Sequence, residues 1–392
     1  MKNSGRMSFA AIWIIFVFMG LYLSKISKIQ IVGLADEWKT GDWLINYADG
    51  FVRRGLLGEI ALFFNSLWGC DLLWTVVNVK ILLYTVIVVF FLLLSLRMKI
   101  GAVDLVLVLA PWGFMFDLND PQSTGRKEIV LLAVFIFYVY LQTFHDHRKD
   151  TAFYRRWEFW FMIAIFPFLT LVHEGLTFFF HFFLLHLVFK KKVLSKNDLI
   201  SFLIPYIASI FMLILIYLYF KGDAHTANSI CLELQSRGVD ASVCAGAISS
   251  LGSYEFQITT DYAKAFVLPI LGTMVFLMCY GVWVFPENFR RCFLMLSLVS
   301  LTPTLPLYIM AADWGRWIHI WGILMFISIY SNKPFKKLNL SAWSLSLKMF
   351  AIVVTSFYLF SWKIPHMLWK TDLSNVRFYY PQDLCGWMKA LL

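Results

Sequence analysis

Residues 36–59 read DEWKTGDWLINYADGFVRRGLLGE and follow the first apolar segment of the chain. The stretch contains five carboxylates, several aromatic rings and glycines, and the adjacent pair Arg53 and Arg54. The sequence on either side of it is mainly apolar. A polar segment in such surroundings is either a solvated connection between helices or the wall of a site, and the rest of the chain decides between the two.

The composition is that of a membrane protein. Of the 392 residues, 60% are hydrophobic and 15% are charged, whereas soluble domains have about 45–50% apolar and about 25% charged residues. We therefore expect an all-α, polytopic membrane protein that forms a single membrane domain over residues 1–392. The formal net charge of +10 does not indicate a nucleic-acid partner, because Lys and Arg lie mainly in short clusters between apolar runs, as membrane topology requires.

About eleven transmembrane helices are expected, because one crossing takes about 20 apolar residues. The expected segments are roughly 8–27, 72–96, 102–116, 128–144, 158–172, 176–189, 199–220, 264–285, 292–311, 315–331 and 341–361. The amino terminus and every second connection contain a basic cluster. The positive-inside rule therefore places these segments on the cytoplasmic side of a bacterial inner (plasma) membrane. The first segment lacks a small-residue cleavage site and is expected to be retained as a helix.

The remaining connections then face the periplasm, and two of them are long, residues 28–71 and 221–263. The apolar stretch 159–189 has basic clusters on both sides, so it is expected to form a re-entrant hairpin rather than one crossing. Its tip carries His173 and Glu174 and would lie below the outer membrane surface. An ionisable pair at membrane depth indicates a functional site.

Cysteine usage agrees with this topology. Cys231 and Cys244 lie 13 positions apart within the polar loop 221–263, and a disulfide is expected there because the periplasm is oxidising. Two free thiols are the alternative. No spacing of Cys, His, Asp or Glu resembles a metal site, so we expect neither a metal nor another cofactor.

Four charged motifs fall on the expected periplasmic side, at residues 36–59, 117–128, 173–175 and 312–317. The inner connections are plain basic clusters without this mixture of acids, bases, glycine and tryptophan. A site that opens to the outer leaflet and is lined by the ends of several helices would explain the convergence. Asp104, near the inner end of a short helix, is expected to be structural.

The residue types in these motifs suit glycosyl transfer from a lipid phosphate. Arginine and lysine can hold phosphate oxygens and stabilise a leaving pyrophosphate; the candidates are Arg53, Arg54, Arg126, Lys127 and Arg316. A carboxylate or imidazole can take the proton of an acceptor hydroxyl; the candidates are His173, Glu174, Asp313 and Asp36. Flat aromatic faces can hold sugar rings; the candidates are Trp43, Tyr47 and Trp314.

Each motif also has a purely structural interpretation. Arg53 and Arg54 could contact lipid phosphates, and residues 126–128 could anchor a helix at the interface. Residues 173–174 could be a satisfied polar tip. Asp313 and Arg316 could be a helix cap and a local ion pair.

Two resemblances follow from these residues. The outward first loop with Asp36-Glu37, followed by an expected amphipathic helix at 55–68, resembles the layout of GT-C membrane glycosyltransferases. That likeness implies an acidic base in the first loop and a polyprenyl-phosphate sugar donor. The whole chain is similar in architecture to Wzy-type polymerases of O-antigen or capsule. That likeness implies an undecaprenyl-pyrophosphate-linked glycan as substrate and a chain-length regulator protein as partner, with membrane lipids around both.

We therefore expect a metal-independent glycosyltransferase, an O-antigen or capsule polymerase of polysaccharide and lipopolysaccharide biosynthesis with its active face in the periplasm. The first alternative is a GT-C-type enzyme that adds a single sugar, with Asp36 or Asp42 as the base. A transporter or flippase of lipid-linked glycans is the second alternative, and it predicts charges near the bilayer midplane or inverted repeats. A scaffold protein is the third.

Overall fold

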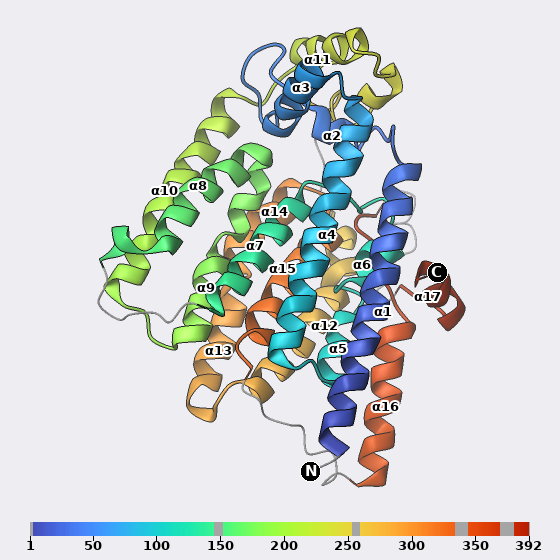
Figure 1. Cartoon of the computed structure of the whole chain (residues 1–392), viewed down its shortest axis with the longest axis vertical. Helices are drawn as coiled ribbons and strands as arrows, with labels where there is room; N and C mark the ends of the chain where they lie inside the picture. Colours follow the sequence, from blue (N-terminus) through green and yellow to red (C-terminus); the bar gives the residue numbers. More distant parts are fainter. Residues whose placement is uncertain (1–2, 145–151, 253–258, 334–343, 369–379, 392) are drawn as a thin grey trace.

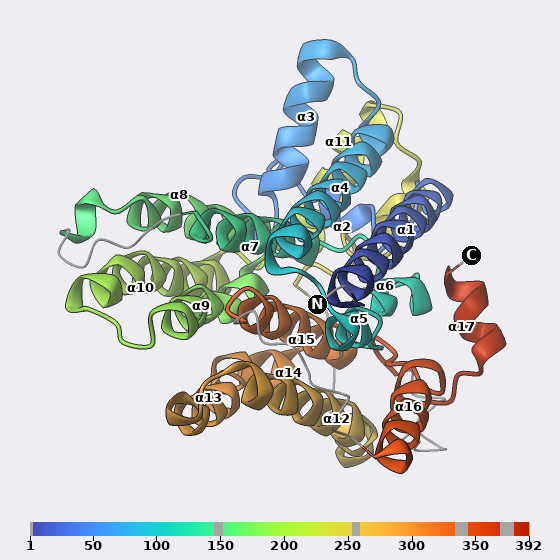
Figure 2. The same ribbon diagram turned by 60° about the horizontal axis from the view of Figure 1, so that its bottom comes forward.

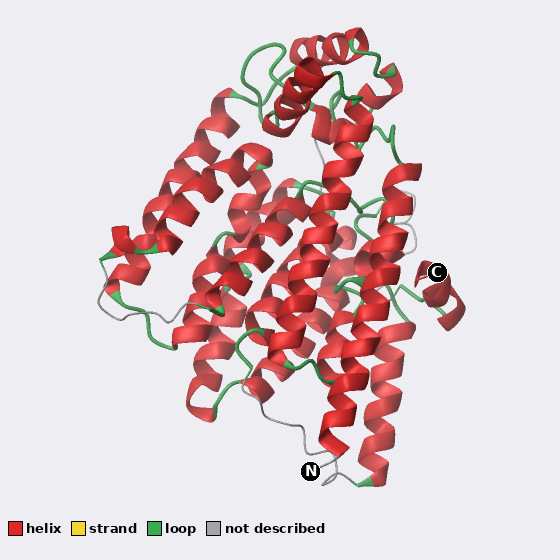
Figure 3. Cartoon of the chain, viewed as in Figure 1, coloured by secondary structure: helices red, strands yellow, loops and turns green. Residues whose placement is uncertain are grey.

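The computed structural model describes residues 3–144, 152–252, 259–333, 344–368 and 380–391. All regular structure within these residues is helical, and the only β contacts among them are two isolated bridges (Figure 3). The class expected from composition is therefore confirmed: the chain is an α-helical protein rich in apolar helices.

Five stretches within the described residues are long and apolar enough to cross a membrane. They lie in α1 (Asn3–Val32), α4 (Leu72–Met98), α10 (Lys196–Tyr219), α12 (Thr260–Val284), and the stretch Glu287–Met310 that α13 (Glu287–Val299) and α14 (Leu305–Met310) share. Each has at least 24 residues, which matches the length that a hydrocarbon layer of about 30 Å requires.

Other apolar helices are shorter. They are α7 (Glu128–Gln142), α8 (Trp157–Val172), α9 (His181–Lys191), α15 (Trp314–Tyr330) and α16 (Leu345–Phe360). All 17 residues of α15 are buried, so this helix is enclosed by protein along its whole length. This enclosure agrees with its sequence, which is mainly apolar on every face of the helix.

The structure does not show the expected count of about eleven spans. The expected span 102–116 is instead two short helices, α5 (Ala102–Val108) and α6 (Met115–Asn119). Pro111 and Gly113 lie in the turn between them, where proline cannot donate to a helix. Mean hydropathy alone does not reveal such a break.

Two further expected spans also differ from a single helix. The segment 292–311 is interrupted by a 3₁₀ turn, η4 (Thr302–Thr304), because Pro303 and Pro306 end regular α hydrogen bonding there. The segment 176–189 begins in another 3₁₀ turn, η2 (Glu174–Phe179). The expected span 341–361 begins outside the described residues, and α16 covers the rest of it.

The helices pack around α15. It contacts α7, α9 and α12, while α4 lies between α1 and α7, and α8 pairs with α10 (Figures 1 and 2). The turn η1 (Phe153–Arg155), which precedes α8, contacts both helices of this last pair. Phenylalanine, tryptophan and tyrosine rings fill much of the core. Because α15 is central, residues in its first and last turns lie deep at the two ends of the bundle.

One end of the bundle carries a cap of polar loops and short helices. It consists of α2 (Gly41–Leu44), α3 (Leu56–Trp68), α11 (Ala224–Ser236) and η3 (Ala241–Cys244), and Figure 1 shows α2, α3 and α11 together at the top with the amino terminus at the bottom. Cys231 and Cys244 form a disulfide with Cα atoms 5.9 Å apart, which ties α11 to η3. Near the carboxyl terminus, α17 (Leu384–Leu391) packs on α6.

The helix α3 lies where an amphipathic helix was expected, at residues 55–68, and one of its faces is buried. Ala61 and Leu62 are buried, whereas Phe63 and Trp68 are more than half exposed. Gly58 permits close packing of this helix on the segment before it, because a Cβ there would lie 2.0 Å from the Ile45 carbonyl oxygen. The first loop is thus a folded part of the cap, not a loose connection.

Candidate functional site

Charged side chains from distant parts of the sequence meet beneath the cap. We call this set the cation cluster; its members are Arg53, Arg54, Arg126, Lys127 and Arg316 with the carboxylates Asp42, Glu128, Glu174 and Asp313. They come from the loop after α1, the start of α7, the tip between α8 and α9, and the start of α15. These are the four motifs that were expected to converge, and the contacts below join them.

Arg54 joins the first loop to the tip at Glu174, 120 residues away. Its Nη2 and Nε donate to the carboxylate at 2.7 and 3.0 Å, which is the fork geometry that makes arginine pairs strong. Arg53 lies 3.8 Å from the same carboxylate through Nη1. Burial opposes the charge on Glu174, but the Arg54 charge outweighs it and lowers the pKa of Glu174 below its usual range. Glu174 is therefore a fixed anion.

Lys127 joins the start of α7 to the same loop. Its Nζ is fully buried, donates to the Arg54 carbonyl oxygen at 2.7 Å and lies 3.8 Å from Asp42. Burial lowers the pKa of Lys127 to about 8. Burial would raise the pKa of Asp42, but the Lys127 and Arg54 charges outweigh it and lower that pKa to about 2. Both side chains are therefore charged at neutral pH.

The backbone at Arg54 is strained. Its φ is +65°, a conformation that costs a bulky residue of the order of 1 kcal/mol or more. Two other non-glycine residues in the described part of the chain have positive φ, Lys99 and Lys192, and both follow helix ends where this conformation is common. Arg54 does not end a helix, and it is held in place by Glu174 and by the Lys127 ammonium on its carbonyl. Strain of this kind concentrates at functional sites.

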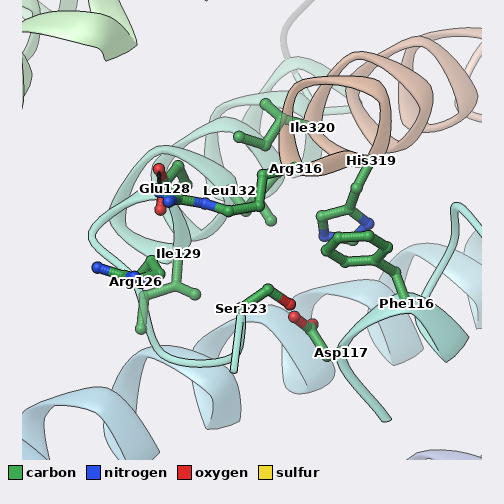
Figure 4. Close-up of a pocket in the computed structure, with 10 residues that line it drawn as sticks. All are labelled: Phe116, Asp117, Ser123, Arg126, Glu128, Ile129, Leu132, Arg316, His319 and Ile320. Atoms are coloured by element: carbon green, nitrogen blue, oxygen red, sulfur yellow. Dashed lines mark hydrogen bonds and ion pairs between the residues drawn. The ribbon is translucent and has the colours of Figure 1, made fainter. Parts of the chain in front are cut away.

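The starts of α7 and α15 are joined by Arg316. Its Nη2 donates to Glu128 (Figure 4). Its Nη1 lies 2.9 Å from Asp313. Glu128 begins α7 and Asp313 precedes α15, where the helix dipole favours negative charge. Burial would raise the pKa of Asp313, but Arg316 and then Arg126 lower it. Asp313 stays about a quarter exposed, at 26% of its side chain.

Arg126 is the cation of the cluster that has no ion pair within the described part of the chain. Its Nη1 donates to the Trp38 carbonyl oxygen at 3.0 Å and its guanidinium lies 5.9 Å from the Trp38 ring centre. Its Nε is buried without a hydrogen-bond partner in that same part. Burial and then the Arg316 charge lower its pKa. With five cations and four carboxylates, the cluster carries about one positive charge in excess.

A turn at Gly125 presents Arg126 and Lys127 to the cluster. Gly125 has φ +81°, a conformation that suits glycine. Its carbonyl oxygen accepts from the Trp43 indole at 2.9 Å, and its N–H donates to the Tyr84 hydroxyl at 3.0 Å. These two hydrogen bonds fix the turn that directly precedes Arg126 and Lys127.

A small pocket lies behind Arg126 and Arg316 (Figure 4). Arg316 and His319 approach it from α15, and Asp117 and Ser123 approach it from the opposite wall. Its volume is about 20 Å³, which is room for about one water molecule. Any ligand larger than a water molecule therefore has to lie outside this pocket.

The expected bases differ in their availability. His173 accepts from the Gly175 N–H through Nδ1 at 3.0 Å, and burial followed by the Arg54 charge lowers its pKa to about 4. The neutral ring then carries its proton on Nε2 and presents a donor. Asp36 accepts from the Trp38 and Lys39 N–H groups through Oδ1. Glu174 is bound to Arg54, which leaves Asp313 as the most accessible carboxylate of the cluster.

Two of the expected sugar-stacking residues are core residues, which corrects the expectation for them. Trp43 is 2% exposed and its indole N–H holds the Gly125 turn. Trp314 is 9% exposed and packs against Tyr262 and Tyr308, with ring centres at 5.5 and 5.2 Å. Burial beneath the cap removes their faces from any ligand. Tyr47 is half-buried and stacks on Phe51 at 5.2 Å.

Two residues that organise the site were not among the candidate catalytic or binding residues. Glu128 pairs with Arg316, and its place at the start of an apolar helix was the one available signal. Lys80 lies within α4, is 1% exposed, and donates through Nζ to the Lys39 carbonyl oxygen at 3.0 Å. A lone lysine inside an apolar run could have pointed to it. Within the described residues, no group of three or more Cys, His, Asp or Glu side chains could hold a metal.

The fold and the cluster together define a multi-pass α-helical membrane protein with a buried, incompletely neutralised ionic site at one end of its bundle. A family described as uncharacterised membrane protein Rv1490 matches residues 9–267, well over half of the chain, and the chain belongs to that family. The matched region contains the first loop, the start of α7 and Glu174, and it ends before Asp313 and Arg316. No curated protein and no solved structure matches the chain.

Proposed function

We propose that the protein is a membrane glycosyltransferase that takes its sugar from a polyprenyl-phosphate-linked donor at the cation cluster. The observation that carries the proposal is Arg126, a partly buried cation without an ion pair among the described residues, whose buried Nε has no hydrogen-bond partner there. Buried donors are nearly always satisfied in proteins. A phosphate oxygen would satisfy this one and remove the excess charge of the cluster.

The reaction would place the donor phosphate against Arg126, with the anomeric carbon on the cap side. A bond forms between the acceptor hydroxyl oxygen and the anomeric carbon, and the bond from that carbon to the phosphate oxygen breaks. The electron pair leaves with the lipid phosphate, whose growing negative charge the arginines stabilise. Asp313 takes the hydroxyl proton, since it is the cluster's most accessible carboxylate.

The charge of the cluster favours a monophosphate donor. A polyprenyl phosphosugar carries one negative charge, which matches the excess of about one positive charge. A pyrophosphate-linked donor carries two. The single-sugar transferase of the GT-C type is therefore the form we propose first.

The O-antigen or capsule polymerase is the second candidate. Arg53 supports it, because its Nε is also buried without a hydrogen-bond partner among the described residues and its nearest carboxylate lies 3.8 Å away. With Arg126, it would supply the second cation that a pyrophosphate needs.

We place the cluster on the periplasmic side of a bacterial inner membrane. The support is the Cys231–Cys244 disulfide, which lies in the same cap as α2 and α3 and suits an oxidising compartment. The basic residues at the end of α9, Lys190 to Lys192, suit a cytoplasmic helix end under the positive-inside rule.

Turnover by the purified protein in lipid nanodiscs tests the proposal. The donors are a polyprenyl-monophosphate sugar, a pyrophosphate-linked oligosaccharide and a sugar nucleotide, each with a labelled sugar and a panel of acceptors. We expect one added sugar from the monophosphate donor, in chelator as well as without it, and loss of turnover in Asp313→Asn. A ladder from the pyrophosphate donor would establish the polymerase instead. Transfer only from the sugar nucleotide, or from none of the three, contradicts the proposal.

A further inference from the structure

A second cavity lies in the cap, next to the cation cluster but separate from it. Its volume is about 300 Å³, the lower end of the range for small-molecule sites. The loop after α2 forms one wall with Phe51, and the end of α10 with the start of α11 forms the other with Tyr219, Asp223 and Thr226. It is therefore built from three segments of the cap.

The aromatic residues of this cavity are exposed, unlike Trp43 and Trp314. Phe51 is 42% exposed and Tyr219 is 72% exposed. Phe51 stacks on Tyr47 and meets the edge of Phe220 with ring centres at 4.8 Å, so its orientation is fixed by both neighbours. A fixed, half-exposed ring beside polar groups is the arrangement that packs against the C–H face of a pyranose ring.

Two polar side chains that line the cavity, Asp223 and Thr226, are held in defined positions. Asp223 accepts from the Thr226 N–H at 2.8 Å, and the Thr226 hydroxyl donates to Asp49, which lies outside the lining, at 3.0 Å. Lys221 adds an ammonium to the lining. A carboxylate and a hydroxyl of fixed direction with a nearby ammonium suit the hydroxyl groups of a sugar, which need both donors and acceptors.

The cavity is connected to the cation cluster through the backbone of Arg53. The Arg53 N–H donates to the Phe220 carbonyl oxygen at 2.9 Å, so the residue that contacts Glu174 also fixes the cavity wall. Gly222, with φ +74°, continues that wall, and a Cβ there would lie 3.0 Å from Val52. The short distance along the chain from Phe51 to Arg53 puts the cavity beside the proposed phosphate site.

We infer that this cavity binds the acceptor saccharide, one pyranose unit of which rests on Phe51 with its hydroxyl groups toward Asp223 and Thr226. The assignment as acceptor rests on the proposed function, whereas the binding of a saccharide does not. The polar side chains in the lining, Asp223 and Thr226, suit hydroxyl groups rather than the hydrocarbon chain of the donor lipid.

Saturation-transfer NMR with a panel of methyl glycosides and disaccharides, on the intact protein in nanodiscs, tests the inference. The variants are Phe51→Ala and Thr226→Val. The matched control is Phe63→Ala, which removes an exposed ring of α3 that does not line the cavity. We expect at least one saccharide to bind, with an affinity about tenfold lower in Phe51→Ala, lower in Thr226→Val and unchanged in Phe63→Ala.

Two outcomes would overturn the inference. One is a panel in which no saccharide binds. The other is equal binding by wild type and by both cavity variants. In the turnover assay, the cavity variants should raise the KM for acceptor and leave the KM for donor unchanged. Saccharide binding without turnover from any lipid donor would remove the proposed function and the acceptor assignment, and keep the saccharide site.

Discussion

The two ends of α15 carry two different arrangements of buried charge. At its start, Arg316 belongs to the cation cluster. After its end, Lys333 pairs with Asp104, which also accepts from the Tyr280 hydroxyl at 2.6 Å and from the Gly101 N–H at 2.7 Å. We call Asp104, Tyr280, Lys333 and Gly101 the Asp104 lock. Both arrangements join segments that are far apart in sequence, and both lie largely out of contact with solvent.

The difference lies in how completely their polar atoms are used. The lock has one carboxylate and one ammonium, and none of its side-chain atoms is among the buried unsatisfied ones in the described residues. The cluster has an excess cation and leaves the Nε atoms of Arg53 and Arg126 without a hydrogen-bond partner there. A closed arrangement stabilises the fold, and an incomplete one is completed by a ligand. We therefore propose that the Asp104 lock has a structural role and that the cation cluster is the functional site.

The largest expected effect is that of Arg126→Ala on turnover. Removing a donor aimed at developing charge lowers the rate by about 10²–10³-fold. The thermal stability should not fall, because the variant removes a partly buried cation that has no ion pair within the described residues and whose pKa burial lowers. Arg126→Lys keeps the charge and loses the fork, so it should recover only part of the rate. A wild-type rate in folded Arg126→Ala would contradict the functional role of the cation cluster.

Asp104→Asn should show the opposite pattern. It leaves the Lys333 ammonium without its counterion, and breaking such a buried pair costs about 3 kcal/mol. The thermal unfolding temperature in nanodiscs should fall, while turnover per folded molecule stays at the wild-type value. Tyr280→Phe is the milder companion and should cost about 1 kcal/mol, one hydrogen bond to a carboxylate. Loss of turnover without loss of stability in Asp104→Asn would reverse the assignment.

Glu174→Gln should affect both turnover and stability, unlike Arg126→Ala and Asp104→Asn. It removes the charge that holds Arg54, whose side chain is 27% exposed, so solvent reduces the cost to about 2 kcal/mol. Turnover should also drop, because Arg54 then leaves its strained position. Thermal unfolding and the rate, measured on the same preparation, check this. A change in only the unfolding temperature would make Glu174 purely structural, and a change in only the rate would make it purely functional.

The smallest effect is a pH dependence from Lys127. Its pKa in the folded protein is about 8, below its ordinary value of 10.5. Between these values the unfolded chain holds a proton that the folded chain has lost, so the contribution of Lys127 to stability rises with pH. Turnover should change in the other direction and be about tenfold lower at pH 9 than at pH 7 as the charge beside Asp42 is lost.

Lys127→Met is the control for both trends, since it cannot titrate. The difference between wild type and this variant isolates the Lys127 contribution in pH series of unfolding and of rate. Parallel changes of stability and turnover with pH would contradict the opposite signs expected here.

The sequence predicted the parts of the fold that depend on local pattern. Long apolar runs identified α4 and α10 within a few residues, and the amphipathic spacing identified α3. It failed at 102–116, because hydropathy averages over the proline and glycine that end α5. Whether a short apolar helix crosses the membrane or lies inside the bundle, as α15 does, depends on its neighbours and not on its own residues.

The same limit applies to the candidate site. Charge, glycine and tryptophan marked the four motifs, since such residues are costly in an apolar chain. Their pairing was not predictable, because it rests on contacts such as Arg54 with Glu174 across 120 residues. Trp43 shows the consequence: its residue type suits a sugar platform, and its place beneath the cap makes it a support for Gly125.

The most direct test of the central claim is the affinity of the purified protein for an undecaprenyl phosphate, measured by tryptophan fluorescence in nanodiscs of zwitterionic lipid. Wild type and Asp104→Asn should bind it equally, and Arg126→Ala should bind it at least tenfold more weakly. Equal affinity in wild type and Arg126→Ala would contradict the claim that the incomplete cluster is a phosphate site.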